Sequence, residues 1–253
     1  MNLRFPAPKA GALATRQRSE SIGVYALELE SVKGYYETMI KLKQKAETVY
    51  SILDELLPPD IQFLEQRDPF RFMISVILSA QTTDRIVNIV TEPLFERFPT
   101  VEALASAPLE EVEEIIFPTG FYRMKAKNIT SCAQALVGKE IPSTMEELIK
   151  LPGVGRKTAN CVIGDIYGKP AIIVDTHFGR VVRRLGLVDT KDPEKIEKQI
   201  SRLLDKEKHY RFSMTVNMFG RTVCHAKKPG CEECPLRSIC PSADAFLKAS
   251  SKG

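Results

Sequence analysis

Residues 143–167, Ser-Thr-Met-Glu-Glu-Leu-Ile-Lys-Leu-Pro-Gly-Val-Gly-Arg-Lys-Thr-Ala-Asn-Cys-Val-Ile-Gly-Asp-Ile-Tyr, predict two helices joined by a tight turn. Ser143 and Glu146 have the spacing of a capping box, which predicts a first helix over 143–150. The two-glycine turn over 151–155 follows directly, and a second helix is expected over 156–167. This stretch is therefore expected to form a helix-hairpin-helix unit.

The turn between these helices has the features of an anion site. Pro152 fixes φ, and Gly153 and Gly155 are expected to supply positive φ and close backbone approach. Arg156 and Lys157 open the second helix, where unpaired N–H groups and the positive end of the helix dipole favour a phosphate. The same positive surroundings disfavour an ammonium ion, so Lys157 is a candidate nucleophile.

Length and composition indicate a globular protein of one large or two modest domains. The 253-residue chain has 43% apolar and 27% charged residues and a net charge of +4, which permits a nucleic-acid partner without requiring one. No apolar run approaches the length of a membrane span, so we expect no membrane partner. The expected place is the cytoplasm, at the nucleoid, or the nucleus or mitochondrion of a eukaryotic host. Reduced thiols are then expected to be metal ligands or buried groups, and Cys132 and Cys161, within predicted helices, are expected in the core.

The rest of the sequence predicts an all-α fold. Apolar residues at three- and four-residue spacing predict helices over 35–56, 69–80, 84–97, 100–106, 109–117, 122–137 and 192–204. Asp68-Pro69 and Asp192-Pro193 each place a cap before a proline at the first helical position. Only 171–174 reads as extended, and one such run cannot form a sheet. Residues 1–33 are expected to form a disordered basic arm, with a transit peptide as the alternative.

A carboxylate follows the extended run, in Val-Asp-Thr-His at 174–177. Asp175 or Thr176 can cap the helix that comes next. A cap position also holds a carboxylate rigidly. If the partner is a nucleic acid and its base is released, positive charge develops at C1′ of the sugar, and an anion nearby stabilises that charge. Asp175 is therefore a candidate partner of Lys157, although its charge also favours the ammonium form of the lysine. The sequence leaves open which of these effects dominates.

Four cysteines lie in a turn-rich segment with the spacing Cys224-x6-Cys231-x2-Cys234-x5-Cys240. Thiols grouped in a loop have no packing role, which favours a metal site. The spacing fits neither the paired CxxC units of common zinc sites nor the pattern of ferredoxins. Structural zinc and a [4Fe–4S] cluster therefore both remain open on spacing alone.

The hairpin with Lys157, the Val-Asp-Thr-His run and the C-x6-C-x2-C-x5-C pattern, in this order, resemble the endonuclease III family of bifunctional DNA glycosylases and AP lyases. The resemblance covers about residues 36–240. It implies a [4Fe–4S] cluster on the four cysteines, Lys157 as the nucleophile and Asp175 as the essential carboxylate.

The resemblance also implies a domain organisation and a partner. It predicts two helical domains with a DNA-binding cleft between them. These are a six-helix domain over 61–170 and a cluster domain over 34–60 and 171–243, followed by a flexible tail over 244–253. The expected partner is double-stranded DNA with oxidised pyrimidines or abasic sites, bound by a monomer.

Further residues are implied as DNA contacts. At the hairpin these are Gly153, Val154, Gly155 and Arg156, and after it His177. Contacts of this kind bind phosphates and carry no sequence information, which suits a search for one damaged base. Additional basic side chains are candidate phosphate contacts, namely Arg123, Lys125, Lys127, Arg221, Lys227 and Lys228.

Two residues are implied in base extrusion. Gln81 matches a family residue that fills the space left by the extruded base, and Phe121 stands where the family inserts an apolar wedge. The alternatives are a polar helix end for Gln81 and a core aromatic for Phe121.

The predicted function is a base excision repair enzyme in which Lys157 attacks C1′, releases the base and then nicks the strand by β-elimination. An adenine or mismatch thymine glycosylase of similar fold is the alternative within this class, but both lack the lysine. A non-catalytic helix-hairpin-helix module with a structural metal is the alternative from another class.

Overall fold

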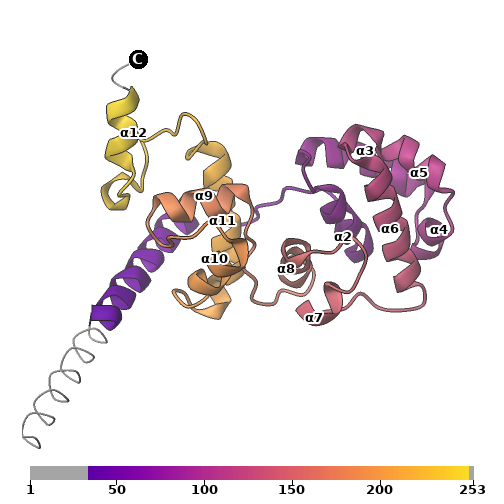
Figure 1. Cartoon of the computed structure of the whole chain (residues 1–253), viewed down its shortest axis with the longest axis horizontal. Helices are drawn as coiled ribbons and strands as arrows, with labels where there is room; N and C mark the ends of the chain where they lie inside the picture. The colour runs from indigo at the N-terminus through magenta and orange to yellow at the C-terminus, as the bar shows by residue number, and fades with distance from the viewer. Residues whose placement is uncertain (1–33, 251–253) are drawn as a thin grey trace, which may run out of the picture. The chain divides into compact units, whose positions relative to one another are not determined.

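The computed structural model describes residues 34–250, and this part of the chain consists of helices and loops without a strand (Figure 1). The predicted all-α fold is thus confirmed. The basic arm predicted over 1–33 lies outside the described residues. No helix among those described is long and apolar enough to cross a membrane.

The chain divides into two compact units, Met1–Lys45 and Ala46–Gly253. The described part of the first unit is helical over 34–45, where Tyr35 and Tyr36 are exposed and their rings make an edge-to-face contact at 6.0 Å. The second unit contains all the predicted site residues.

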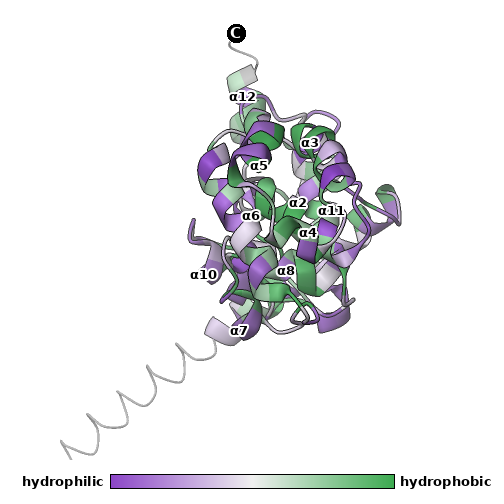
Figure 2. Ribbon diagram, turned by 90° about the vertical axis from the view of Figure 1, so that its right-hand side faces the viewer, coloured by the Kyte–Doolittle hydropathy of each residue, from purple (hydrophilic) through white to green (hydrophobic). Residues whose placement is uncertain are grey.

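One hydrophobic core in the second unit runs from Leu64 to Ala171. Its helices are α2 (Pro69–Leu78), α3 (Asp84–Arg97), α4 (Val101–Ala105), α5 (Leu109–Ile116), η1 (Phe117–Thr119), α6 (Tyr122–Leu136), α7 (Met145–Leu148) and α8 (Arg156–Asp165). Every residue of α2 from Phe72 to Leu78 is buried, and the helix is mostly hydrophobic (Figure 2). Because α2 packs on α3, α6 and α8, it connects the hairpin to the rest of this group.

A second group of helices follows Ala171, comprising α9 (Thr176–Arg184), α10 (Pro193–Ile200), η2 (Lys206–Lys208) and α11 (His209–Thr222). In α9 and α11, which pack together, the rings of Phe178 and Phe212 meet edge to face at 5.9 Å. Arg211 of α11 donates to Asp54 at 2.6 Å and to the Leu57 carbonyl at 3.0 Å, which attaches α11 to the end of the helix over 34–56. α11 has no counterpart among the predicted ranges.

The predicted helix starts are confirmed at two prolines and at Arg156, and the start predicted for the first helix of the hairpin is wrong. Asp68 caps α2 by accepting from the Arg71 N–H at 3.0 Å, and Asp192 caps α10 in the same way. The capping pair of α7 is Thr144 with Glu147, one residue later than predicted. The sequence offers both registers, and the later one is compatible with the complete burial of Leu148.

The predicted flexible tail over 244–253 is in part a helix, α12 (Ala243–Ser250), which follows the short η3 (Arg237–Ile239). Ala243 is buried, and the guanidinium of Arg184 lies 4.4 Å from the centre of the Phe246 ring. The contact with Arg184 gives the tail a partner that its composition did not indicate.

The two isolated cysteines differ in their surroundings. Cys132 is fully buried, as predicted, and burial raises the pKa of its thiol to about 12. Cys161 is only half-buried and lines a cavity, although desolvation still raises its pKa to about 11. The core position predicted for both is thus confirmed for Cys132 alone.

Candidate active site

The hairpin turn uses its two glycines differently. Gly153 has φ +77°, and a Cβ there would lie 2.9 Å from Cβ of Asn128 and 3.0 Å from Cγ2 of Ile77. Gly153 therefore has to be glycine, as predicted. The positive φ predicted for Gly155 is wrong, because Gly155 is the N-cap of α8 and has the extended backbone of a cap, φ −91° and ψ 177°. No atom lies within 4 Å of a Cβ built on Gly155, so the approach to the helix start is open.

The residues around Gly155 differ in whether their polar groups are hydrogen-bonded within the chain. Val154 is buried and its N–H donates to the Leu151 carbonyl at 3.1 Å. Arg156 donates to both carboxylate oxygens of Glu197, at 2.7 and 2.9 Å, and this hydrogen bonding raises the pKa of the guanidinium. The free groups at this point are the first N–H groups of α8 and the exposed side chain of Lys157.

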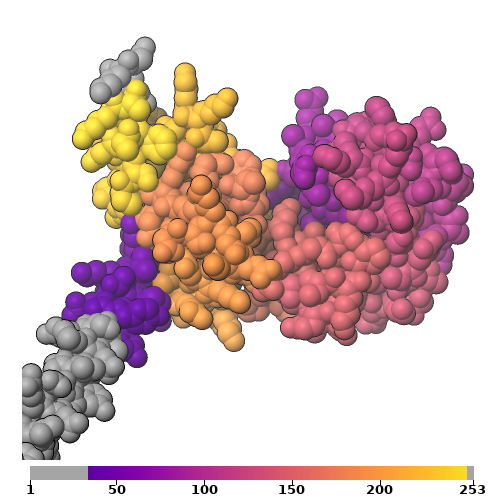
Figure 3. Space-filling model, viewed as in Figure 1, coloured from indigo at the N-terminus to yellow at the C-terminus, as the bar shows by residue number. Residues whose placement is uncertain are grey.

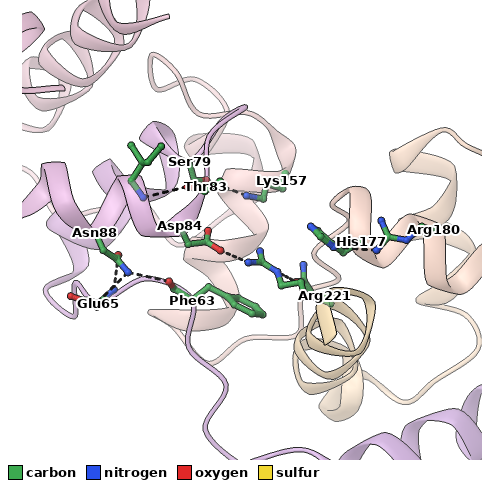
Figure 4. A network of polar contacts seen from close by, with 12 residues as sticks. Phe63, Glu65, Ser79, Thr83, Asp84, Asn88, Lys157, His177, Arg180 and Arg221 are labelled. Atoms are coloured by element: carbon green, nitrogen blue, oxygen red, sulfur yellow. Dashed lines mark hydrogen bonds and ion pairs between the residues drawn. The ribbon is translucent and has the colours of Figure 1, made fainter. Parts of the chain in front are cut away.

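Lys157 extends from the first turn of α8 toward the end of α2 (Figure 4). Its Nζ donates to Oγ of Ser79 at 3.3 Å, while the Ser79 hydroxyl donates to the Val76 carbonyl at 2.8 Å. Within the described chain no carboxylate lies within 4.0 Å of this ammonium group. One long hydrogen bond thus leaves the amine free to reach a ligand.

Asp175 is the N-cap of α9, as predicted, and its Oδ1 accepts from the Phe178 N–H at 2.7 Å. Capping uses only this oxygen, since Oδ2 has no hydrogen-bond donor among the described residues. The carboxylate is half-buried. It is therefore held in place while one of its oxygens remains available.

Two cavities meet at Lys157 and Asp175. An open cleft has walls from α3, α9 and α10, and a hollow between the magenta and orange parts of the surface is visible in Figure 3. A smaller, largely apolar cavity lies beside it. Both are lined by Ser79, Asp84, Lys157, Asp175 and Arg221. The lysine and the carboxylate thus stand on a wall that the two cavities share.

The cleft is basic and contains the predicted contact His177. Arg180, Arg183 and Lys191 add their charges to the cleft wall. Burial lowers the pKa of His177, with Asp175 opposing this effect, and Nη2 of Arg180 lies 3.2 Å from Nδ1 of the ring. A cationic donor at Nδ1 requires that nitrogen to accept, so the imidazole is neutral in this arrangement.

Arg221 lies at the junction of the cavities rather than over the cysteine loop. It makes an ion pair with Asp84 of α3, donates to Asn217 at 2.6 Å and lies 4.1 Å from the centre of the Phe63 ring (Figure 4). Our sequence reasoning missed Ser79 and Asp84. The sequence marks them only by their position near Gln81, since Ser79 lies two residues before it and Asp84 three residues after it.

Gln81 and Phe121 are the non-glycine residues with positive φ in the described part of the chain, at 53° and 49°. Gln81 is exposed in the turn after α2 and lines the cleft. Phe121 is 62% exposed, which excludes the core-aromatic alternative.

The prediction of Lys125 as a phosphate contact is wrong, since Lys125 is only 4% exposed and donates to the Thr119 carbonyl at 2.9 Å.

The four predicted cysteine ligands line one small cavity of about 400 Å³, together with Leu236 and Phe246. Arg184 donates to Sγ of Cys224 at 3.3 Å and to the carbonyls of His225 and Ala226 at 2.7 and 2.8 Å. No group of three His, Cys, Asp or Glu side chains among the described residues is arranged to hold a single metal ion. The structure thus brings the four cysteines together on the wall of one cavity.

Comparison with known proteins places this site in a family. Residues 74–206 match the HhH-GPD superfamily of base excision DNA repair proteins. The chain is 44% identical over 211 residues to endonuclease III of Synechocystis, covering 82% of this chain and 96% of the relative. The chain belongs to the endonuclease III family.

Solved structures of endonuclease III agree with this assignment. A non-covalent endonuclease III–DNA complex and a trapped endonuclease III–DNA covalent intermediate each match with a TM-score of 0.77 and 39% sequence identity. Each alignment covers 81% of this chain and 98% of the solved chain. The fold predicted from the sequence is therefore that of endonuclease III.

Membership of the endonuclease III family confirms the predicted activity, a DNA N-glycosylase with AP lyase activity in base excision repair. The adenine or mismatch glycosylase and the non-catalytic module are not favoured. Around the cleft of this endonuclease III fold, the structure gathers Gln81, Lys157, Asp175 and His177. Phe121 and the four cysteines lie elsewhere on the chain.

Proposed function

We propose that this chain removes oxidised pyrimidines from double-stranded DNA and nicks the resulting abasic site, with Lys157 as the nucleophile. The observation that carries this proposal is the position of Lys157 and Asp175 on the wall shared by a basic cleft and an apolar cavity. A duplex backbone in the cleft and one extruded base in the cavity would bring C1′ of that nucleotide beside the amine. The trapped covalent intermediate of the related endonuclease III supports a covalent route.

DNA is held by contacts that do not depend on its sequence. The open approach to Gly155 and the unpaired N–H groups of α8 suit one phosphate, and Arg183 and Lys191 suit others along the cleft. Gln81 fills the space of the extruded base and Phe121 inserts between base pairs. Because phosphate contacts carry no base information, discrimination falls to the cavity.

The first chemical stage releases the base. The neutral amine of Lys157 attacks C1′, and the glycosidic bond breaks with its electron pair leaving on the base, which takes up a proton. The nitrogen then loses its proton and the sugar ring opens at O4′, which is protonated. The product is a Schiff base between Lys157 and C1′.

The second stage nicks the strand. Loss of a proton from C2′ expels the 3′ phosphate by β-elimination, and water then hydrolyses the Schiff base and regenerates Lys157. Asp175 acts in both stages, because its available oxygen stabilises positive charge on the sugar and accepts or returns protons at the lysine nitrogen. Its cap bond to Phe178 keeps it in place throughout.

The smaller cavity is proposed as the base pocket. Most of its exposed wall is apolar, and besides the charged residues shared with the cleft it is lined by polar side chains, among them Gln62, Ser213 and Asn217. A pocket of this kind orients a ligand through a small number of hydrogen bonds. Added hydroxyl or carbonyl groups on an oxidised pyrimidine would be the partners for these side chains.

We also propose that Cys224, Cys231, Cys234 and Cys240 hold a [4Fe–4S] cluster. The donor set fits, because four cysteines line one cavity and thiolates are the ligands of iron–sulfur clusters. The cluster would supply iron–thiolate bonds that cross-link the loop over 224–240, and base release and strand nicking use no electron from it.

The domain division is a proposal with the same boundaries as predicted, 61–170 for the six-helix domain and 34–60 with 171–243 for the cluster domain. The core that runs from Leu64 to Ala171 supports the first domain. The contacts between α9 and α11, and between Arg211 and the end of the first helix, support the second.

Borohydride trapping tests the proposed function. The purified chain is mixed with a duplex that carries thymine glycol, or an abasic site, and any Schiff base is reduced to a stable adduct. We expect an adduct with the wild type and with Lys198→Met, an exposed lysine of α10 outside both cavities, but none with Lys157→Met. An adduct that survives Lys157→Met would contradict the assigned nucleophile, and a wild type that forms an adduct with the abasic duplex but not with the thymine glycol duplex would contradict the substrate.

A further inference from the structure

Lys125 is a buried lysine without a counterion. Its side chain belongs to α6, is 4% exposed, and has no carboxylate within 4.0 Å among the described residues. Its one hydrogen bond, from Nζ to the Thr119 carbonyl, is 2.9 Å long. Desolvation lowers the pKa of this lysine. Burying a charged group is unfavourable unless the group makes strong hydrogen bonds. The burial of this ammonium group with a single hydrogen bond therefore calls for an explanation.

The Thr119 carbonyl accepts a second hydrogen bond, from Oγ1 of Thr82 at 2.8 Å. Thr82 directly follows Gln81, and Thr119 precedes Phe121 by two residues. One carbonyl oxygen therefore connects the turn after α2 with the turn before α6. These turns carry the two non-glycine residues with positive φ in the described chain.

The backbone N–H of Lys125 donates to the Phe121 carbonyl at 3.1 Å, which is the first hydrogen bond of α6 and does not depend on the side chain. The same residue thus binds the carbonyls on both sides of Gly120, which itself has φ +67°. Backbone in the left-handed region persists for non-glycine residues only where neighbouring contacts specify it. Thr82 supplies such a contact between the two turns, and the side chain of Lys125 holds the carbonyl that accepts it.

We propose that Lys125 is a positioning residue that holds Gln81 and Phe121 in one fixed arrangement for base extrusion. This inference rests on the proposed function, in which the two side chains act on the same nucleotide step. A filler and a wedge act together only if their separation is constant, and small displacements of such groups reduce rates strongly. A purely structural lysine would instead affect every activity of the chain alike.

Two variants test the inference, each removing one of the bonds to the Thr119 carbonyl. Lys125→Met removes the ammonium group and keeps most of the side-chain volume, and Thr82→Val removes the hydroxyl and keeps the shape. The control is Lys139→Met, because Lys139 also donates to a backbone carbonyl, that of Ala135 at 3.0 Å, but is exposed and lies outside both cavities. Thermal unfolding of each variant is recorded alongside activity.

Each protein is measured in single turnovers on two duplexes, one with thymine glycol and one with a preformed abasic site. An abasic nucleotide has no base to unstack, so it depends less on the filler and the wedge. We expect Lys125→Met and Thr82→Val to slow base release about tenfold or more while strand nicking at the abasic site stays within about threefold of wild type. Lys139→Met should match wild type on both duplexes.

Equal losses on the two duplexes, or no loss on either, would overturn the positioning role. A wild type that is inactive on both duplexes would overturn the proposed function and this inference with it. An active wild type that Lys125→Met and Thr82→Val match in base release would overturn the inference alone.

Discussion

The polar side chains at the starts of α8 and α9, Lys157 and Asp175, make few hydrogen bonds within the chain. The polar groups of the loop over 224–240 make many. At the loop, Arg184 of α9 reaches Cys224, His225 and Ala226, and Arg180 of the same helix donates to the Cys224 carbonyl at 3.0 Å. At α8, Lys157 makes one hydrogen bond of 3.3 Å. Asp175 uses one of its two oxygens.

This difference separates a region with a fixed shape from a region with unused bonding capacity. Networks of buried hydrogen bonds specify one conformation, and losing a member leaves its partners unsatisfied. Groups with few internal partners contribute little to stability and are available to a substrate, so their replacement affects chemistry first. We therefore expect substitutions at Lys157 and Asp175 to change rates, and substitutions at Arg184 to change stability.

The largest effect is expected from Lys157→Arg, which keeps the charge and removes the nucleophile. Base release from a damaged duplex should fall by a factor of about 10⁴ or more, since a chemical step is lost. The free energy of unfolding should change by less than about 0.5 kcal/mol, because the wild-type side chain is exposed. Single-turnover assays measure the rate of base release, and denaturant unfolding measures the free energy of unfolding. A variant that releases the base at the normal rate would rule out Lys157 as the nucleophile.

Asp175→Asn should produce the next largest loss. Asparagine caps a helix as well as aspartate does, so the cap of α9 and the stability should be retained. The loss of charge and of proton transfer should slow base release by about 10² to 10⁴. The matched control is Asp192→Asn at the cap of α10, which lies outside both cavities and should leave the rate unchanged. If both variants behave alike, Asp175 is only a cap.

Arg184→Met tests the other side of the comparison. The loss of its bonds to the cysteine loop should lower the free energy of unfolding by about 2 kcal/mol and release iron faster. The exposed Arg202→Met serves as the control and should change neither quantity. The decay of the thiolate-to-iron absorbance measures the loss of iron, and thermal unfolding measures the stability. An Arg184→Met protein with normal iron retention and stability would show that the loop does not depend on this network.

Sequence patterns identified the parts of the site that are encoded locally. Gly153 and Lys157 are fixed by one turn and the helix that follows it, and Asp175 by a cap position. These residues could be predicted because their geometry depends on neighbours within a few positions along the chain. The all-α fold followed in the same way from apolar periodicity.

The partners that complete the site are distant in sequence, and local patterns do not encode them. Arg221 pairs with Asp84 across 137 residues, and Arg156 pairs with Glu197 across 41. The latter pair shows why the positive surroundings predicted for Lys157 were incomplete, since a carboxylate from α10 balances the neighbouring arginine. Lys125 illustrates the same limit, because only the fold reveals that it is buried.

The smallest predicted effect concerns Ser79, which accepts the hydrogen bond of Lys157 and is the C-cap of α2. Ser79→Ala should slow base release about threefold, the equivalent of one modest hydrogen bond that orients the amine. Ser201→Ala is a close control, because Ser201 is the C-cap of α10 and its Oγ likewise donates to a carbonyl three residues earlier, at 3.1 Å. Removing either hydroxyl should have the same small effect on unfolding. A rate loss confined to Ser79→Ala would assign the hydroxyl to positioning the amine, whereas equal rates in the two variants would mean that the amine finds its position from the substrate alone.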